Sequence, residues 1–584
     1  MKPLHTRLWG IVVFLLFWAA SAQGQDIHAT HPNFTSALGL DVRSTKHNLS
    51  ISGPGDLTAA SESRICVFCH IPHQKGPAAR YLWNRSDPAN AYIPYFSSTL
   101  KADVGQPTGA SRMCLSCHDG TIALGAVASS PTEIPLKGGI RFMPFDSAAN
   151  LGTDLSDDHP VSFVYDDMLA LDNRQLREPS TLPPQVRLEG NRLQCTACHD
   201  PHHNPYGNFL VMDNTASSLC RACHEMTDWL NSSHARSTAS LDRTGGLWAN
   251  TDYATVGENG CENCHTPHTA GGKERLLLFA YEEDNCLACH DGKVASTDIA
   301  FEVTKPYGHK VQDYTDVHDA AEDFTLGRVE KHVECSDCHN PHQANGNPSP
   351  GGGLVSGATT GVSGVSAAGQ AVDSARYLYE ICFKCHGDAD NNVVSTLSIA
   401  RQLTNINTRA AFDLSGPSFH PVEGPGKNPD VPSLLPPYTV NSVITCTDCH
   451  GNSDRLGPSG LHGSDFEHLL TDRYVTGDNT PESLSSYALC YKCHSRSVLL
   501  SDTSFEHSRH VVDQQAPCSA CHDPHGISAL QGNALHNSHL LNFDLGIVST
   551  TNTGRLEFED QGVLRGQCFL TCHGRLHNPA IYPE

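Results

Sequence analysis

Hydrophobic residues recur along this chain of 584 residues without the spacing of a long helix or of a strand. Apolar positions neither return every three to four residues nor alternate with polar ones over useful lengths, and glycine and proline interrupt them throughout. We therefore predict a mostly irregular coil with short helices and few strands. The helices are expected at, or directly after, a recurring cysteine motif.

One long apolar run is present near the start, from Leu8 to Ala20, with Lys2 and Arg7 before it and Ala20-Ser21-Ala22 at its end. This layout is typical of a secretory signal peptide cleaved after Ala22. A membrane anchor is the alternative, but a run of this length is short for a bilayer. We expect a signal peptide at 1–22, an exported chain at 23–584 and no transmembrane segment.

The dominant pattern is a pair of cysteines two residues apart with a histidine directly after the second. The paired cysteines are Cys66 and Cys69, Cys114 and Cys117, Cys195 and Cys198, Cys220 and Cys223, Cys261 and Cys264, Cys286 and Cys289, Cys335 and Cys338, Cys382 and Cys385, Cys446 and Cys449, Cys490 and Cys493, and Cys518 and Cys521. Two such thiols add to the vinyl groups of a haem, and the histidine ligates the iron. Zinc sites and redox dithiols also use Cys-x-x-Cys, but neither requires a histidine at that place. Eleven repetitions favour c-type haem.

The histidine that closes each motif is the expected proximal iron ligand. These residues are His70, His118, His199, His224, His265, His290, His339, His386, His450, His494 and His522. A twelfth segment has three residues between Cys568 and Cys572 and ends in His573. We interpret it as an expanded haem site with His573 as proximal ligand; the alternative is a disulfide or free thiols beside a surface histidine. The twelve pairs use all 24 cysteines.

The motifs form six pairs of irregular spacing, and in five pairs the first motif continues as Cys-His-x-Pro-His. Because the proline fixes a turn, the extra histidine cannot bend back to the same iron, and we expect it to ligate a neighbouring haem. A hydrogen bond to a propionate or carbonyl is the alternative. The fifth pair lacks the extension and offers His462 instead. The candidates are His73, His202, His268, His342, His462 and His525.

A second set of histidines precedes the pairs. Its members are His47, His159, His234, His309, His420 and His510. One upstream and one downstream histidine per pair give twelve distal ligands for twelve irons. Alternative candidates are His332, His507, His539 and His577, whereas His318 and His536 are expected at the surface. Methionine is too rare for general use as a ligand, so we predict bis-histidine haems of low potential.

Composition explains how such a chain can fold. Only 39% of its residues are hydrophobic, and 48 are glycine and 35 proline. A share of about 47 residues per haem is too small for a separate protein core around each, so we expect the haems themselves to form the core of one elongated unit. Residues 344–370, rich in glycine, serine and alanine, are predicted to be a flexible insertion. The net charge of −24 argues against nucleic acid as a partner.

Several segments resemble a known family. These are KHNLSISGPG with CVFCHIPH, CLSCHDGTIALG, the five Cys-His-x-Pro-His repeats, and the ending NSHLLNFD, GRLEFEDQG and CFLTCHG. They are similar to the doubled-CXXCH multihaem c-type cytochromes of metal-reducing bacteria, a group with cytochrome c3-like and outer-surface members. The resemblance implies a periplasmic or outer-surface electron carrier, and some relatives polymerise into extracellular filaments.

The leading hypothesis is non-enzymatic electron transfer through twelve c-type haems, from the periplasm to an external acceptor, with a filament or other homo-oligomer as one form. Expected partners are other cytochromes and an extracellular metal or mineral acceptor. The expected location is extracellular or at the outer cell surface, with the periplasm as the alternative. The rival is a reductase of a small oxyanion or nitrogen compound with one open iron, which we would seek at His573. No Cys-x-x-Cys-Lys motif supports that rival.

Overall fold

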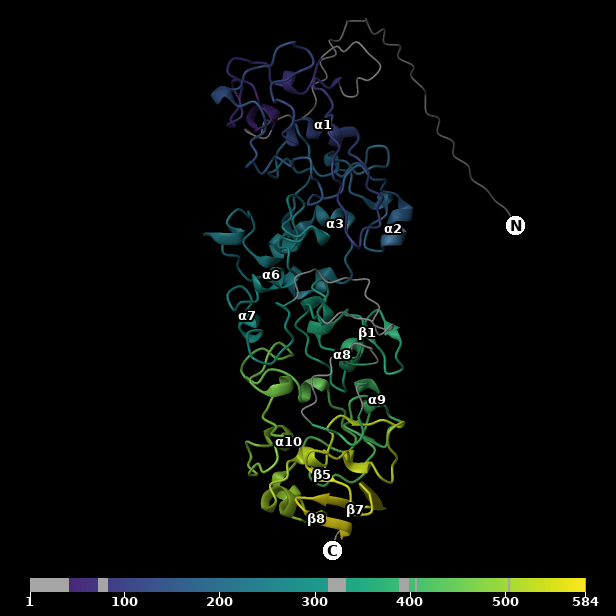
Figure 1. Ribbon diagram of the computed structural model, residues 1–584. Helices are drawn as coiled ribbons and strands as arrows, with labels where there is room; N and C mark the ends of the chain where they lie inside the picture. Colours follow the sequence, from purple (N-terminus) through teal and green to yellow (C-terminus); the bar gives the residue numbers. More distant parts are fainter. Residues whose placement is uncertain are drawn as a thin grey trace, which may run out of the picture.

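The chain forms an elongated body in which sequence order follows the long axis (Figure 1). The computed structural model describes residues 41–71, 82–313, 332–387, 399–404, 407–502 and 505–582. The expected signal peptide, His73 and His318 lie outside these residues. Because the colours in Figure 1 pass steadily from one end to the other, motifs that are neighbours in the sequence are also neighbours in space.

The helices are short, as the absence of a sustained hydrophobic period predicts. The two longest, α1 (Gly109–His118) and α8 (Leu378–His386), end on motif histidines. The others are α2 (Asp167–Asn173), α3 (Cys220–Cys223), α4 (Ser233–Arg236), α5 (Val256–Asn259), α6 (Glu282–Leu287), α7 (Ile299–Glu302), α9 (Thr408–Phe412), α10 (Ala488–Tyr491) and α11 (Arg496–Leu499). None of the helices in the described ranges is long and apolar enough to cross a membrane.

The two motifs of a pair differ in local structure. The first motif of every pair lies in a short 3₁₀ turn: η2 (Cys66–Phe68), η6 (Cys195–Ala197), η10 (Gly260–Asn263), η13 (Cys335–Asp337), η15 (Cys446–Asp448) and η18 (Cys518–Ala520). The second motif of the first five pairs lies in or overlaps an α-helix, namely α1, α3, α6, α8 and α10. The twelfth motif differs from all of these, since it lies in a strand.

Strands are few. β1 (Gly364–Val365) pairs with β2 (Ala371–Val372), and β3 (Ser418–Phe419) pairs with β4 (Gly526–Ile527), both antiparallel. A sheet at the C-terminal end contains β5 (Val548–Ser549), β6 (Glu557–Gly562), β7 (Arg565–Cys572) and β8 (Arg575–Tyr582). β7 pairs with β5 and β6 along one edge and with β8 along the other, always antiparallel. The fold is thus coil with short helices and a few small strands, as predicted from the sequence.

Buried apolar side chains form small separate clusters instead of one core. The largest contains six buried residues around Phe163 and Tyr165, and others contain only three, such as the cluster of Tyr92, Leu115 and Leu155. Residues 344–370, expected as a flexible insertion, contribute to two of these clusters through Val362 and Val365. Their packing near α8 makes this stretch part of the folded body.

Candidate functional site: a chain of paired histidines

Each Cys-x-x-Cys-His motif closes one tight turn. In nine motifs the histidine N–H donates a hydrogen bond of 2.7–3.0 Å to the carbonyl of the first cysteine; the histidines are His70, His199, His224, His265, His290, His339, His450, His494 and His522. In the other two Cys-x-x-Cys-His motifs the histidine ends α1 or α8. This turn is the local reason that a spacing of two residues presents both sulfurs together, as double attachment to one group requires.

The imidazoles are oriented by main-chain carbonyls. The Nδ1 atom lies within hydrogen-bond distance of a carbonyl oxygen in these pairs: His47 and Pro201, His118 and Ala149, His159 and Pro160, His199 and Asn208, His234 and Pro341, His265 and Arg275, His339 and Ala358, His420 and Pro524, His450 and His468, His510 and Glu506, and His522 and His539. A ring held in this way donates from Nδ1 and keeps the Nε2 lone pair for a metal.

Motif histidines face a second histidine across a short gap. The ring centres are 5.9–6.5 Å apart in His70 and His202, His118 and His47, His199 and His268, His224 and His159, His265 and His342, His290 and His234, His339 and His462, His386 and His309, His450 and His525, and His522 and His507. Two imidazoles on one metal, with bonds of about 2.0 Å, have ring centres about 6 Å apart. The gaps fit one iron each.

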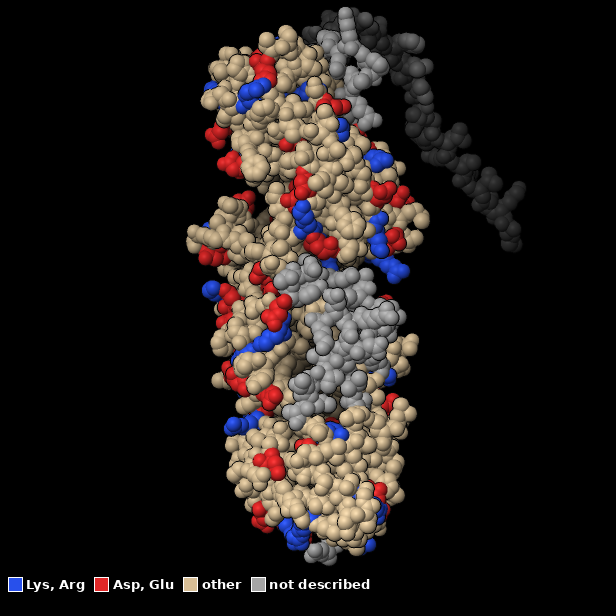
Figure 2. Space-filling view, viewed as in Figure 1, with Lys and Arg blue, Asp and Glu red and all other residues tan. Residues whose placement is uncertain are grey.

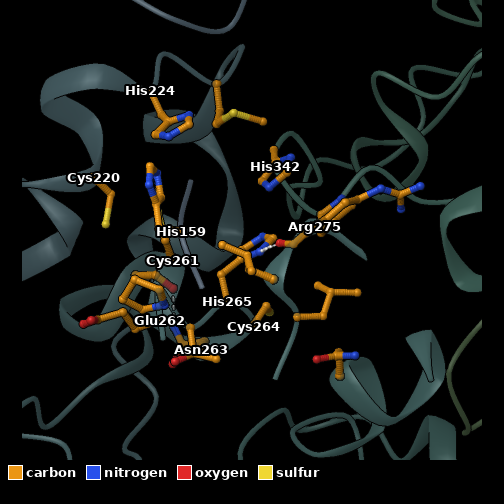
Figure 3. Close-up of a pocket in the computed structure, with 18 of the residues that line it drawn as sticks. His159, Cys220, His224, Cys261, Glu262, Asn263, Cys264, His265, Arg275 and His342 are labelled. Carbon is orange, nitrogen blue, oxygen red and sulfur yellow. Dashed lines mark hydrogen bonds between the residues drawn. The ribbon is translucent and has the colours of Figure 1, made fainter. Parts of the chain in front are cut away.

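Figure 3 shows two such sites side by side. His224 faces His159, and His265 faces His342, while the dashed line marks the hydrogen bond of 2.8 Å that joins His265 Nδ1 to the Arg275 carbonyl. Burial is the main cause that lowers the pKa of His224 and of His342 to about 4. Both rings are therefore neutral at pH 7, the form that binds a metal.

The histidines of the Pro-His segments face motif histidines of the preceding pair. His202, His268, His342 and His525 each face the first motif histidine of the pair before their own, and His462 does the same for His339 although its segment lacks the proline. Consecutive pairs are thus staggered, because each one supplies a histidine to the pair before it.

The upstream histidines face the histidine of the second motif of their own pair. His47, His159, His234 and His309 face His118, His224, His290 and His386 in turn. In three pairs the ring is fixed by the proline carbonyl of the following pair: His47 by Pro201, His234 by Pro341 and His420 by Pro524. One Cys-His-x-Pro-His segment therefore contributes both a ring and an anchoring carbonyl to its predecessor.

Three placements remain. After burial, the charge of His420 is the next cause that lowers the pKa of His494 to about 4, which places these two rings close together. His522 faces His507, one of the alternative candidates, with ring centres 6.5 Å apart. His510 faces His577 instead of a motif histidine, with ring centres 6.2 Å apart.

Planes of facing rings alternate along the chain. In the first site of each pair the rings are within 10–32° of parallel. In the second site of the first four pairs the angle is 55–88°. The alternation follows the local structure, since the 3₁₀ turn and the helix present the motif histidine differently.

Cysteines of successive motifs lie against one another. A hydrogen bond to the next thiol is the largest cause that raises the pKa of Cys114 beside Cys195, and the same relation joins Cys220 to Cys261, Cys286 to Cys335, Cys382 to Cys446, and Cys518 to Cys490. Within pairs, burial and then the neighbouring thiol raise the pKa of Cys69 beside Cys117, Cys198 beside Cys223, and Cys264 beside Cys289. Neighbouring thiols therefore follow one another in sequence order.

A continuous cavity of about 4430 Å³ connects the first eight sites. It is lined by both cysteines and the histidine of each of the first eight motifs and extends from Val42 to Thr471. A cavity of this length, bordered at intervals by sulfurs and facing imidazoles, has the shape required by a row of large flat groups.

A buried acidic cluster lies beside the sixth and seventh motifs. Glu334 is 1% exposed and precedes Cys335, while Glu282 binds the N–H of Ser336. Burial, and after it the charges of Glu282, Glu283 and Asp337, raises the pKa of Glu334 to about 8. This carboxyl is therefore protonated at pH 7.

We expect the potential of a neighbouring haem to fall as the pH rises through about 8. Loss of the Glu334 proton leaves a negative charge that stabilises the oxidised iron, with a slope of at most about 59 mV per pH unit. Redox titrations between pH 6.5 and 9.5 should show this slope in the wild type and lose it in Glu334→Gln. The exposed Glu225→Gln variant is the control, and an unchanged slope in Glu334→Gln would contradict the assignment.

The residues fit haem c and not the alternatives. All 24 cysteines are free of disulfide bonds. A zinc site needs four ligand atoms that converge, and among the residues described the only cluster of three or more metal-binding groups is His536, Glu557 and Glu559, which contains no cysteine. Adjacent sulfurs suit attachment to the two haem vinyl groups, while a neutral histidine and a second histidine, about 6 Å apart between ring centres, suit the two axial ligands of a haem iron.

Comparison with known proteins agrees with this chemistry. A family model for the doubled CXXCH motif matches residues 189–228 and 254–295, which contain the second and third pairs. A protein named multiheme cytochrome MtrA, from Shewanella baltica (strain OS185), is 27% identical over 164 residues, or 26% of this chain. The match covers 36% of that relative's length. Over these residues the chain is similar to multihaem c-type cytochromes of the doubled-CXXCH type.

Proposed function

We propose that the chain binds twelve c-type haems and conducts electrons along them in sequence order. When bound, haem c supplies the one-electron redox chemistry. The observation that carries the proposal is the unbroken series of facing histidines, whose cysteines adjoin from the first motif to the last. At the first eleven motifs the proposed iron ligands are the motif histidine and the ring that faces it.

The chain's own residues would make such a series a conductor instead of a set of reactive centres. A second histidine at each site fills the position that a substrate would need, and the carbonyl anchors keep that ring in place. Because successive sites are close together, electrons can pass between them without large motions of the chain. An electron carrier is therefore favoured over a reductase.

We further propose an exported protein that passes electrons between redox proteins and an external acceptor, at the cell surface or in the periplasm, alone or as a filament subunit. Acidic residues outnumber basic ones by 63 to 39, and on the face in Figure 2 both kinds are scattered over the length of the body. This excess favours basic redox proteins or cationic metal species as partners.

Spectroscopy of the purified protein tests the proposal. Intact mass should give twelve haems, and every haem should be low-spin and unchanged by carbon monoxide after reduction. Because ring planes are near parallel at some sites and near perpendicular at others, the oxidised protein should show two kinds of low-spin paramagnetic signal, one rhombic and one strongly anisotropic. A high-spin haem that binds carbon monoxide would favour the reductase.

A further inference from the structure

The twelfth motif, Cys568 to His573, has a backbone unlike the other eleven. Its two cysteines lie four residues apart on β7, so their side chains point to the same face of the sheet. His573 and Gly574 then form the two-residue turn into β8, with φ values of 48° and 75°. No helical turn brings His573 back beneath the sulfurs, as happens in the Cys-x-x-Cys-His motifs.

The Nε2 atom of His573, which would have to bind the iron, is instead bonded to a carboxylate. This atom lies 2.9 Å from one carboxylate oxygen of Asp478 and 3.0 Å from the other. The anchored histidines of the other motifs use Nδ1 for such contacts and leave Nε2 free. The structure therefore places His573 at the end of the hairpin, held by a carboxylate, which differs from the role expected from the sequence.

His577, and not His573, lies on the same face of the hairpin as the two cysteines. It lies on β8 directly opposite Leu570 of β7, and residues that face each other across antiparallel strands project to the same side. Leu570 lies between Cys568 and Cys572 and shares their face, where Phe558 and Val548 are also buried. His577 is thus the histidine that projects on the cysteine face of the hairpin.

The facing ring completes the site. His510 lies 6.2 Å from His577 between ring centres, within the range of the other pairs, and its Nδ1 is 2.8 Å from the Glu506 carbonyl. His510 is also the upstream histidine of the sixth pair, and in the other pairs this residue serves the second site. The position, the spacing and the anchor all agree with a ligand of the twelfth iron.

We propose that the haem attached to Cys568 and Cys572 is ligated by His577 and His510, with His573 off the iron and paired to Asp478. The inference rests on the proposed function only in requiring a haem at this motif. It assigns to the segment the pattern Cys-x3-Cys-His-x3-His, in which the second histidine replaces the adjacent one.

Alanine variants of His577, His510 and His573 test the assignment. His577→Ala should retain every haem by intact mass but convert one of them to a high-spin form that binds carbon monoxide when reduced, and His510→Ala should do the same. His573→Ala, the matched control, should leave the haem count and spectra unchanged. The proposal fails if His573→Ala produces the high-spin haem while His577→Ala leaves all haems low-spin.

The His577→Met variant keeps the test decisive if His577→Ala loses the haem. If His577→Ala lacks one haem, His577→Met should restore it as a low-spin haem of raised potential, because a thioether ligand favours the reduced iron; an unshifted set of potentials would overturn the proposal. Mass analysis of the wild-type peptide containing Cys568 and Cys572 separates the two levels of inference. A haem-free peptide removes this site alone and leaves electron transfer through the other eleven to be judged by their own spectra.

Discussion

Replacement of His462 by alanine is expected to convert one haem from a low-spin to a high-spin form that binds carbon monoxide. His462 faces His339 with ring centres 6.0 Å apart and an angle of 10° between the rings. Burial, and then the charge of His339, lowers the pKa of His462 to about 4, which keeps the ring neutral. Without it, the iron at the seventh motif has an open sixth position. Optical and paramagnetic spectra with and without carbon monoxide measure the change.

The control for this prediction lies in the same loop. His468 lies beside the ninth site, and its main-chain carbonyl is 2.9 Å from His450 Nδ1. The His468→Ala variant keeps that carbonyl, so its spectra should match the wild type. If His462→Ala remained fully low-spin with an unchanged haem count, another residue would have to ligate the seventh iron and the stagger between the fourth and fifth pairs would be wrong.

The second large effect concerns folding. A chain produced without haem attachment should show no cooperative unfolding transition and should be digested rapidly by protease. Its buried apolar clusters are small and separate, and a cavity of about 4430 Å³ runs between them. Such clusters cannot offset the conformational entropy of so many coil residues, so covalent haem must supply the core. Circular dichroism and limited proteolysis measure both effects.

Loss of a single haem should have a local effect instead. A Cys335→Ser and Cys338→Ser double variant should lose only the haem of the seventh motif. The facing histidines of all other sites are unchanged, and only His462 is left without a proposed iron. This variant should stay folded and protease-resistant at its two ends. A cooperative transition of the haem-free chain, comparable to that of the double variant, would show that the protein part carries a sufficient core by itself.

The stagger of the pairs has a physical consequence for the whole body. Each site is closed by residues from the next unit, through a ring such as His202 and a carbonyl such as that of Pro201. Under the proposed ligation, neighbouring units are linked by metal ligands as well as by packing. This linkage explains how an elongated coil can keep successive sites in contact without long helices or a large sheet.

The sequence by itself determined the chemistry of this protein and its class of fold. The attachment motif is local: two cysteines and a histidine within five residues form one turn, whatever surrounds them, so the cofactor could be predicted from spacing alone. Weak periodicity and abundant glycine and proline also predicted short helices in coil correctly. These features depend on neighbours in the chain, which a sequence displays directly.

Only the tertiary structure decided which histidine faces which. Facing rings are separated by 132 positions for His70 and His202 and by 123 for His339 and His462, and no local rule fixes such a partner. The same holds for His573 and His577, four residues apart: the choice between them depends on a hairpin whose register turns one ring towards Asp478 and the other towards His510. The pairing of facing rings is a property of how units stack, because the second ring comes from outside the turn that holds the first.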